Sequence, residues 1–225
     1  MSAGYFVTGT DTGVGKTLMT CALLHAFARR GRRVVGMKPV AAGAVRDAHG
    51  WCNDDVRMLS AASNIDAPRH LVNPYCFEAS IAPHIAAQRA SVTIDLTRIA
   101  RAYSGLAALA DVVLVEGVGG FCVPLGSDCD SADLAHELKL PVILVVGVRL
   151  GCLNHALLTA RAVRAAGLVL AGWIANRVDP AMAAADENVD ALDERLAAPR
   201  LGDVRFVAEP DPQAVAELLE LVALG

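Results

Sequence analysis

The amino-acid sequence predicts an α/β fold, a doubly wound and mainly parallel sheet with helices on both faces. Short runs rich in Val, Ile and Leu recur along the chain and are bounded by Gly, Pro or charged residues. These runs are apolar at consecutive positions, which is typical of parallel strands that are buried on both faces. Helical patterns lie between them, and the alternation of strand and helix indicates a doubly wound domain.

Each predicted element is a stretch of one periodicity between two breaking signals. The predicted strands are residues 5–8, 34–37, 112–115, 142–148, 169–175 and 204–208. The predicted helices are residues 18–30, 54–62, 82–89, 95–109, 131–138, 153–166, 181–197 and 212–223. Proline suits a first helical turn, Asp or Ser caps a helix, and Gly favours its end, so the boundary signals are Pro83, Asp130 or Ser131, Gly31 and Gly167. Residues 41–53 are the least regular part of the first half, and we expect them to form an active-site loop.

Composition limits the kind of protein. The chain has 225 residues and 54% of them are hydrophobic, so we expect a single domain over residues 1–225. The formal net charge of −4 favours neither nucleic acid nor an anionic membrane as a partner. The chain starts without a signal-peptide pattern, and its longest aliphatic run, residues 142–148, is far shorter than a bilayer span of about 20 residues. We therefore expect a cytoplasmic protein whose six cysteines are reduced thiols.

Residues 9–17, Gly-Thr-Asp-Thr-Gly-Val-Gly-Lys-Thr, lie between a predicted strand and a predicted helix. A strand that turns through glycines into a helix beginning Gly-Lys-Thr is a P-loop, so the fold is P-loop NTPase-like. Backbone N–H groups can surround a polyphosphate there, Lys16 neutralises the outer phosphates, and the Thr17 hydroxyl can bind magnesium. Gly9 stands one residue too early for the plain pattern, so the loop is a variant. A Gly/Thr-rich turn that binds nothing is the alternative, but the flanking strand and helix favour a nucleoside triphosphate.

Charged side chains follow the second and third predicted strands, at the carboxyl ends where ligands gather in such sheets. Lys38 could add a second positive charge to a transferring phosphoryl group, although a lysine that only extends to solvent is the alternative. Glu116 has the place of an acid that reaches the metal beside a P-loop. Asp55 lies at a predicted helix start, where an acidic residue often serves only the helix dipole. With Thr17, these two carboxylates form an oxygen ligand set for Mg²⁺.

Two later strand ends offer polar groups with more than one interpretation. The helix start after residues 142–148 could hold a substrate carboxylate, but Asn154 could equally be a cap. The next strand ends in Asn176 and Arg177, where an amide could read a base edge, although a turn-forming Asn is the commoner use.

With these segments in order, the chain resembles the dethiobiotin synthetases, which close the ureido ring in biotin synthesis. The matching segments are residues 5–12 with 14–17, 38–40, 73–75, 83–84, 115–117 with 119–120, and 150–156. The early glycine of the P-loop is also what that family shows. The resemblance covers residues 5 to about 180 and weakens toward the C-terminus.

The resemblance implies a ligase that forms C–N bonds and converts 7,8-diaminononanoate, CO2 and MgATP to dethiobiotin, ADP and phosphate. One amine takes up CO2 as a carbamate, a carbamate oxygen attacks the γ-phosphate, and the second amine closes the ring on the carbamic-phosphoric anhydride. Catalysis would fall to Lys16 and Lys38, and Mg²⁺ binding to Thr17, Asp55 and Glu116. The implied nucleotide contacts are Thr12, Gly13, Val14, Gly15, Lys16, Thr17, Asp55, Glu116, Gly117, Val118, Gly119, Asn176, Arg177, Arg205, Phe206 and Val207. The implied substrate contacts are Ala42, Pro83, Gly151, Cys152, Leu153 and Asn154, with the Asn154 helix start supplied by the partner subunit of a homodimer.

Two positions depart from the family pattern. Gly13 stands where some members carry Glu, so a side-chain contact to nucleotide is missing, and Ala42 stands where others offer a hydroxyl to the substrate. Neither change removes a charge that phosphoryl transfer requires.

The main alternative is a partition or cell-division switch ATPase. Those proteins carry a signature lysine early in the P-loop, where this chain has Asp11, and residues 214–224 hold no Lys or Arg for a membrane-binding helix. The synthetase domain of a cobyrinate-type amidotransferase shares the fold, but it needs a glutaminase domain for which no residues remain.

Overall fold

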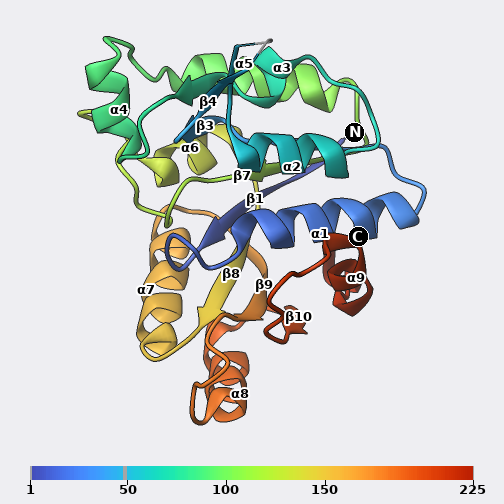
Figure 1. Ribbon diagram of the computed structural model, residues 1–225. Helices are drawn as coiled ribbons and strands as arrows, with labels where there is room; N and C mark the ends of the chain where they lie inside the picture. The colour runs from blue at the N-terminus through green and yellow to red at the C-terminus, as the bar shows by residue number, and fades with distance from the viewer. Residues whose placement is uncertain (1, 48–49, 225) are drawn as a thin grey trace.

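A six-stranded sheet runs through the centre of the computed structural model, which describes residues 2–47 and 50–224 (Figure 1). The strand order is β10-β9-β8-β1-β7-β2, and every neighbouring pair is parallel. The strands are β1 (Ala3–Gly9), β2 (Val34–Met37), β7 (Val112–Glu116), β8 (Val142–Val148), β9 (Leu170–Arg177) and β10 (Arg200–Val204). From β1 the chain crosses to the edge strand β2, returns through β7, and then continues on the other side of β1 through β8, β9 and β10. Because strands are added on both sides of β1, the predicted doubly wound, parallel fold is confirmed.

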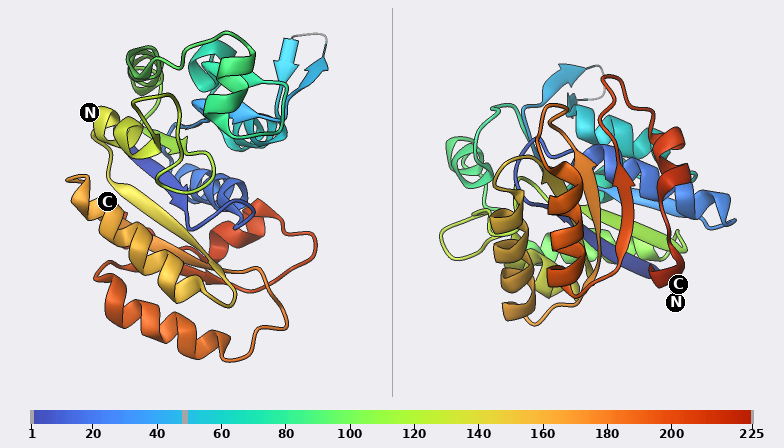
Figure 2. Two further views of the ribbon diagram at one scale, coloured as in Figure 1. Left: turned by 90° about the vertical axis from the view of Figure 1, so that its left-hand side faces the viewer. Right: turned by 90° about the horizontal axis from the view of Figure 1, so that it is seen from below.

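Helices cover both faces of this sheet. They are α1 (Lys16–Arg29), α2 (Asp54–Ala62), α3 (Arg69–Val72), α4 (Pro83–Arg89), α5 (Leu96–Ala107), α6 (Ser131–Leu138), α7 (Cys152–Ala165), α8 (Ala185–Leu196) and α9 (Pro212–Val215). Phe6 and Val7 are adjacent on β1 and belong to two separate core clusters, since successive side chains of a strand point to opposite faces. The Phe6 cluster includes α5, α6, α7 and α8, and the Val7 cluster includes α1 and α9. Figure 2 shows the two layers, with α7 and α8 on one side of the sheet and α1 and α9 on the other.

The strand order brings three chain segments together at one edge of the sheet. β7 pairs with β1 through Glu116 and Val7, and with β2 through Val115 and Met37. The carboxyl ends of β1, β7 and β2 are therefore neighbours, although they are far apart in the sequence. The P-loop, Glu116 and Lys38 follow or end these three strands, so the sheet places them side by side.

The last strand lies earlier in the chain than predicted. The prediction of residues 204–208 is wrong, because β10 comprises residues 200–204 and pairs with β9. Leu201 and Val204 are buried, whereas Phe206 and Val207 are exposed. The strand was therefore predicted too late because Phe206 and Val207 are apolar. This pair lies just beyond the carboxyl end of the strand.

The C-terminal helix is also shorter than the predicted residues 212–223. After α9 the chain forms two 3-10 turns, η1 (Ala216–Leu218) and η2 (Val222–Leu224), with Leu219 extended between them. The Glu220 N–H donates to the Leu201 carbonyl, so the sheet takes a backbone bond that a continuous helix would have used.

The helix predicted at residues 181–197 begins later, at Ala185. Asp179 accepts hydrogen bonds from the backbone N–H groups of Ala181 and Met182, which form a turn in place of the first helical residues. Ala184, before the helix, has a left-handed conformation with φ 55°.

Residues 41–53 are not the irregular loop that was predicted. β3 (Val40–Ala42) pairs in parallel with β6 (Tyr75–Phe77), and β4 (Val45–Asp47) pairs in antiparallel with β5 (Gly50–Cys52). Residues 48 and 49 lie outside the described part of the chain. Strands of three residues are too short to give a periodic signal, which explains why the sequence did not predict them.

The predicted helix boundary signals are confirmed. Pro83 opens α4, Asp130 forms a capping box at the start of α6, and Gly31 and Gly167 follow helices with positive φ angles of 75° and 74°. Among residues 2–47 and 50–224, none of the helices combines the length and the apolar character needed to span a bilayer.

Candidate active site

The P-loop joins β1 to α1, and its backbone is fixed by contacts with residues of neighbouring strands. Val14 is buried, and a Cβ on Gly9 or Gly147 would overlap its side chain, so both neighbours must be glycine for the loop to pack here. The Asn176 Nδ2 donates to the Val14 carbonyl at 2.8 Å. Gly15 precedes α1 with φ 84°, and the first turn of the helix has no side-chain cap. The helix N-terminus is thus available to phosphate oxygens.

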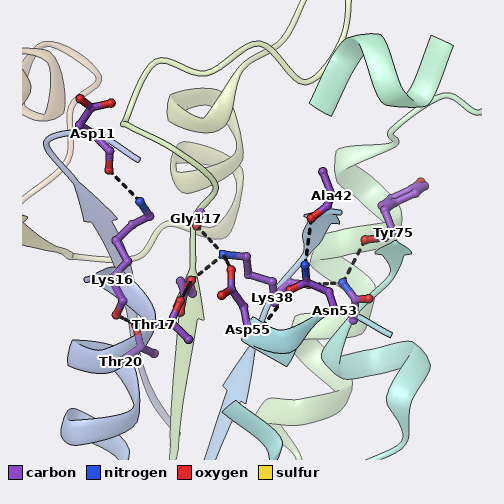
Figure 3. A network of polar contacts seen from close by, with 12 residues as sticks. Asp11, Lys16, Thr17, Thr20, Lys38, Ala42, Asn53, Asp55, Tyr75 and Gly117 are labelled. Carbon is purple, nitrogen blue, oxygen red and sulfur yellow. Dashed lines mark hydrogen bonds and ion pairs between the residues drawn. The ribbon is translucent and has the colours of Figure 1, made fainter. Parts of the chain in front are cut away.

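Lys16, the first residue of α1, lies folded over this loop. Its Nζ donates to the Asp11 carbonyl at 2.9 Å (Figure 3). Burial, and then the positive charge of Lys38, lower the pKa of Lys16 to about 8. At neutral pH the lysine is therefore mostly charged, and bound phosphates would favour that charged form further.

A second lysine contacts two carboxylates and a backbone carbonyl at the same edge. The Lys38 Nζ is 2.5 Å from Glu116 Oε1 and 2.9 Å from Asp55 Oδ2, and it donates to the Gly117 carbonyl at 3.3 Å. The Thr17 hydroxyl donates to Glu116 Oε1 at 2.9 Å. Figure 3 shows Lys38 pointing between Asp55 and Gly117 toward Thr17. The predicted set of Thr17, Lys38, Asp55 and Glu116 therefore converges.

The carboxylates keep this buried lysine charged. Lys38 is 4% exposed, and burial alone would lower its pKa, but Glu116 and Asp55 outweigh that effect, so its pKa lies above the ordinary value. Burial likewise raises the pKa of Asp55, and Lys38 outweighs it, so the net pKa is lowered. Lys38 is thus not the solvent-extended side chain of the alternative interpretation.

The oxygen atoms around Glu116 fit a magnesium ion. Glu116 Oε2 is buried and has no hydrogen-bond partner among the residues that the structure describes, while Thr17 and Asp55 add a hydroxyl and a second carboxylate. Within the described residues, no three His, Cys, Asp or Glu side chains form a group that could hold a metal by themselves. Such a site matches Mg²⁺, which typically binds one or two carboxylates together with waters and substrate phosphates.

A cavity of about 710 Å³ opens over these residues. Predicted residues that line it are Thr12, Gly13, Gly15, Lys16, Thr17, Lys38, Ala42, Asp55, Pro83, Glu116, Val118 and Gly119. The lining residues that the sequence did not predict are Asp11, Ser80, Ile81, Ala82, Gly120 and Val123. Segment 80–82 could have been predicted from Pro83, because the residues directly before a helix lie close to the first residue of that helix.

The remaining predicted residues lie outside the cavity lining. Val14 packs below the P-loop, and Gly117 meets Lys38 through its carbonyl. Asn176 contacts the P-loop backbone, as described above. The predicted substrate contacts Gly151, Cys152, Leu153 and Asn154 form the start of α7 and do not line the cavity of their own chain.

The predicted nucleotide contacts near the C-terminus have mixed surroundings. Arg177 is engaged by two carboxylates, at 2.7 Å from Asp203 Oδ2 and 2.6 Å from Asp186 Oδ1. Arg205, Phe206 and Val207 are exposed just after β10, at the sheet edge that also carries the P-loop. Their position leaves them free to meet a ligand.

We expect Gly15→Ala to lower the free energy of unfolding more than Gly13→Ala does. Both glycines have positive φ, 84° and 74°, so either alanine costs about 1–2 kcal/mol in the backbone. A Cβ at position 15 would also overlap the Asn176 Nδ2, whereas one at position 13 has nothing within 4 Å. Overpacking adds about 1–3 kcal/mol, which urea unfolding without nucleotide can resolve. Equal losses in the two variants would show that Asn176 does not hold the loop.

Comparisons with known proteins show what this chain is similar to. A family model described as an AAA domain matches residues 3–214. The chain is 59% identical over 217 residues to the ATP-dependent dethiobiotin synthetase BioD of Aromatoleum aromaticum, which covers 96% of each chain. It is 56% identical over 225 residues to the protein of the same name from Nitrosospira multiformis, covering 100% of this chain and 98% of that one. Among solved structures, the septum site-determining protein MinD of Pyrococcus horikoshii matches with a TM-score of 0.55 and 18% identity, over 91% of this chain and 82% of that one. That likeness concerns the fold alone.

Proposed function

Since the chain belongs to the family of ATP-dependent dethiobiotin synthetases, we propose that the cavity over its P-loop is where 7,8-diaminononanoate, CO2 and ATP become dethiobiotin, ADP and phosphate. The enzyme is a ligase that forms C–N bonds. The observation that supports the location is the convergence of the P-loop, two lysines and two carboxylates in one cavity. The reaction is therefore assigned from the dethiobiotin synthetase family and not from the switch ATPases, although the two groups share the fold.

The proposed reaction has three bond-forming steps. One amine adds to CO2 and, after losing a proton, becomes a carbamate anion. A carbamate oxygen bonds to the γ-phosphorus while the bond to ADP breaks, which gives the carbamic-phosphoric anhydride. The second amine then attacks the carbonyl carbon and loses a proton, so that the second C–N bond forms as the bond from carbon to the phosphate oxygen breaks and phosphate leaves. Holding the diamine and ATP in one cavity makes these steps effectively intramolecular.

The charged side chains of this chain are proposed to serve the phosphoryl step. The α1 N-terminus and Lys16 bind the ATP phosphates, since this end of the helix is uncapped and Lys16 lies over the loop. Lys38 is held charged and buried, so it can stabilise negative charge on the carbamate and the transferring group. Both lysines act as fixed cations that need no reorganisation during the reaction.

We assign Thr17, Asp55 and Glu116 to Mg²⁺ binding, because their oxygens form the hard ligand set described above. A bound Mg²⁺ would supply further neutralisation of phosphate charge. The residues themselves set its place: Glu116 is fixed at the end of β7, and Thr17 is fixed on the first turn of α1.

A homodimer with the substrate site at its interface is also part of the proposal. Ala42 and Pro83 line the cavity of one chain, whereas residues 151–154 do not. The start of α7 has no side-chain cap among the described residues, so its N–H groups can bind the carboxylate of a substrate that lies in the cavity of the partner chain. Leu150 beside it is 91% exposed, which suits a contact surface.

We further propose that the whole chain acts as one synthetase domain in the cytoplasm, on small molecules and without nucleic acid or membrane partners. The two core clusters share one continuous sheet, which supports a single domain. All six cysteines are free, which suits a reducing compartment.

We expect ADP release to require both diaminononanoate and bicarbonate. ATP binds at the P-loop, but the phosphoryl acceptor is a carbamate that exists only when the diamine and CO2 are both present. The assay measures ADP with each added alone and with both together, and the combined reaction should exceed either single one by at least tenfold, because a missing acceptor removes the chemical step. Rapid turnover without diamine that DNA or liposomes stimulate would instead support a switch ATPase.

A further inference from the structure

Asp11 places a negative charge on the loop that must accept polyphosphate. Its side chain is 48% exposed and lines the cavity. The charged residues of that lining are two lysines and three carboxylates, which gives a formal charge of −1. A bound Mg²⁺ would offset Asp55 and Glu116, so Asp11 is the carboxylate of the lining whose charge would act against the ATP phosphates unless another cation lies close by.

Arg149 supplies that cation from a different part of the chain. Its NH2 group is 2.6 Å from Asp11 Oδ2, and the pair joins the segment after β8 to the P-loop. The second carboxylate oxygen of Asp11 accepts from the Thr12 N–H at 2.7 Å. The Asp11 carbonyl accepts from Lys16 Nζ, so the arginine holds a residue that in turn holds the phosphate-binding lysine.

The carboxyl end of β8, which directly precedes Arg149, is hydrogen-bonded to the same loop. The Thr10 N–H donates to the Val145 carbonyl at 3.0 Å, and the Gly147 N–H donates to the Thr10 hydroxyl at 3.3 Å. Val14 packs against Gly147 so closely that no side chain fits there. The end of β8 and the P-loop therefore form one rigid unit, and the Arg149 guanidinium does not need to be ordered by ligand.

We propose that Arg149 is a positioning residue of the nucleotide site: it neutralises Asp11 and holds that carboxylate away from the ATP phosphates. The inference rests on the proposed role of the P-loop in binding ATP. Arg149 does not take part in bond making in this proposal. Its effect belongs to nucleotide affinity, because the charge of Asp11 acts on bound phosphates before and during the reaction.

The experiment compares ATP binding and turnover in four variants: Arg149→Gln, Arg149→Lys, Asp11→Asn and the double variant Asp11→Asn/Arg149→Gln. We expect Arg149→Gln to weaken ATP binding about fivefold at low salt and less at high salt, since the pair is half exposed and screened. Its kcat should stay within about twofold, so KM for ATP carries the loss. Arg149→Lys should retain most of the affinity, and the double variant should bind within about twofold of wild type, because it lacks both charges.

Three results would overturn the proposal: wild-type affinity in Arg149→Gln, a double variant no better than Arg149→Gln, or a loss in kcat alone. Folding is checked by thermal unfolding, and little change is expected because exposed ion pairs contribute little to stability. ATP binding to the wild type is measured first. If the wild type binds ATP but releases no diamine-dependent ADP, the proposed function fails while the Arg149 comparison can still be read.

Discussion

Lys38→Gln should lower kcat by about a hundredfold or more while ATP binding changes much less. The side chain keeps its approximate length and loses its charge. A single preorganised electrostatic contact to developing charge is commonly worth about 3 kcal/mol, which is about a hundredfold in rate. Lys38 qualifies because it is 4% exposed and held at 2.5 and 2.9 Å by Glu116 and Asp55, so it is charged and fixed before substrate arrives.

The matched control is Lys139→Gln, which removes an exposed lysine after α6 and should leave kcat unchanged. Lys38→Gln also leaves two carboxylates without their cation, and breaking a buried ion pair can cost about 3–5 kcal/mol of stability. Unfolding is therefore measured for each variant, and kcat is taken where the protein is folded. Near-normal kcat with only a raised KM for ATP would show that Lys38 merely holds nucleotide, and its catalytic assignment would be withdrawn.

The meeting of Lys38 and Glu116 could be predicted because it follows from a rule about sheets. Side chains at the carboxyl ends of parallel strands lie at one edge, and an apolar strand that ends in a charged residue marks that edge in the sequence. The order β1-β7-β2 makes the rule specific, since it puts the P-loop next to both residues. The resemblance to a known family then supplied their roles.

Contacts that depend on register and loop shape could not be predicted in this way. The pairing of Arg149 with Asp11 joins positions 138 residues apart, and no periodicity connects them. The Asn176 contact to the Val14 carbonyl is of the same kind, and only the sheet register brings them together. The last strand was predicted at the wrong residues because local composition did not match burial. Phe206 and Val207 are apolar but exposed, while Gly202 lies inside β10, where a side chain would overlap Leu219.

The variants Glu116→Gln and Asp55→Asn should each raise the Mg²⁺ concentration needed for half-maximal turnover by about tenfold or more. Losing even an outer partner of a metal ligand typically costs 10–100-fold in affinity, so losing a ligand should cost at least as much. Glu116→Gln should have the larger effect, because Glu116 Oε2 is buried and, within residues 2–47 and 50–224, has no hydrogen-bond partner that would compete with a metal ion. Asp55 is the more exposed of the two, with 40% of its side chain accessible, so water can partly replace it.

Asp54→Asn provides the matched control for this metal site. Asp54 neighbours Asp55 on α2, but its side chain is 85% exposed and pairs with Arg57 at 3.1 Å, so its Mg²⁺ titration should match wild type. Each single variant leaves Lys38 with one carboxylate, so the fold should survive, and thermal unfolding checks this. Mg²⁺ titrations of ADP release and of ATP binding separate the metal effect from a general loss of activity. If both variants titrate like wild type, Asp55 and Glu116 serve only to hold Lys38, and the magnesium site has to be sought elsewhere around Thr17.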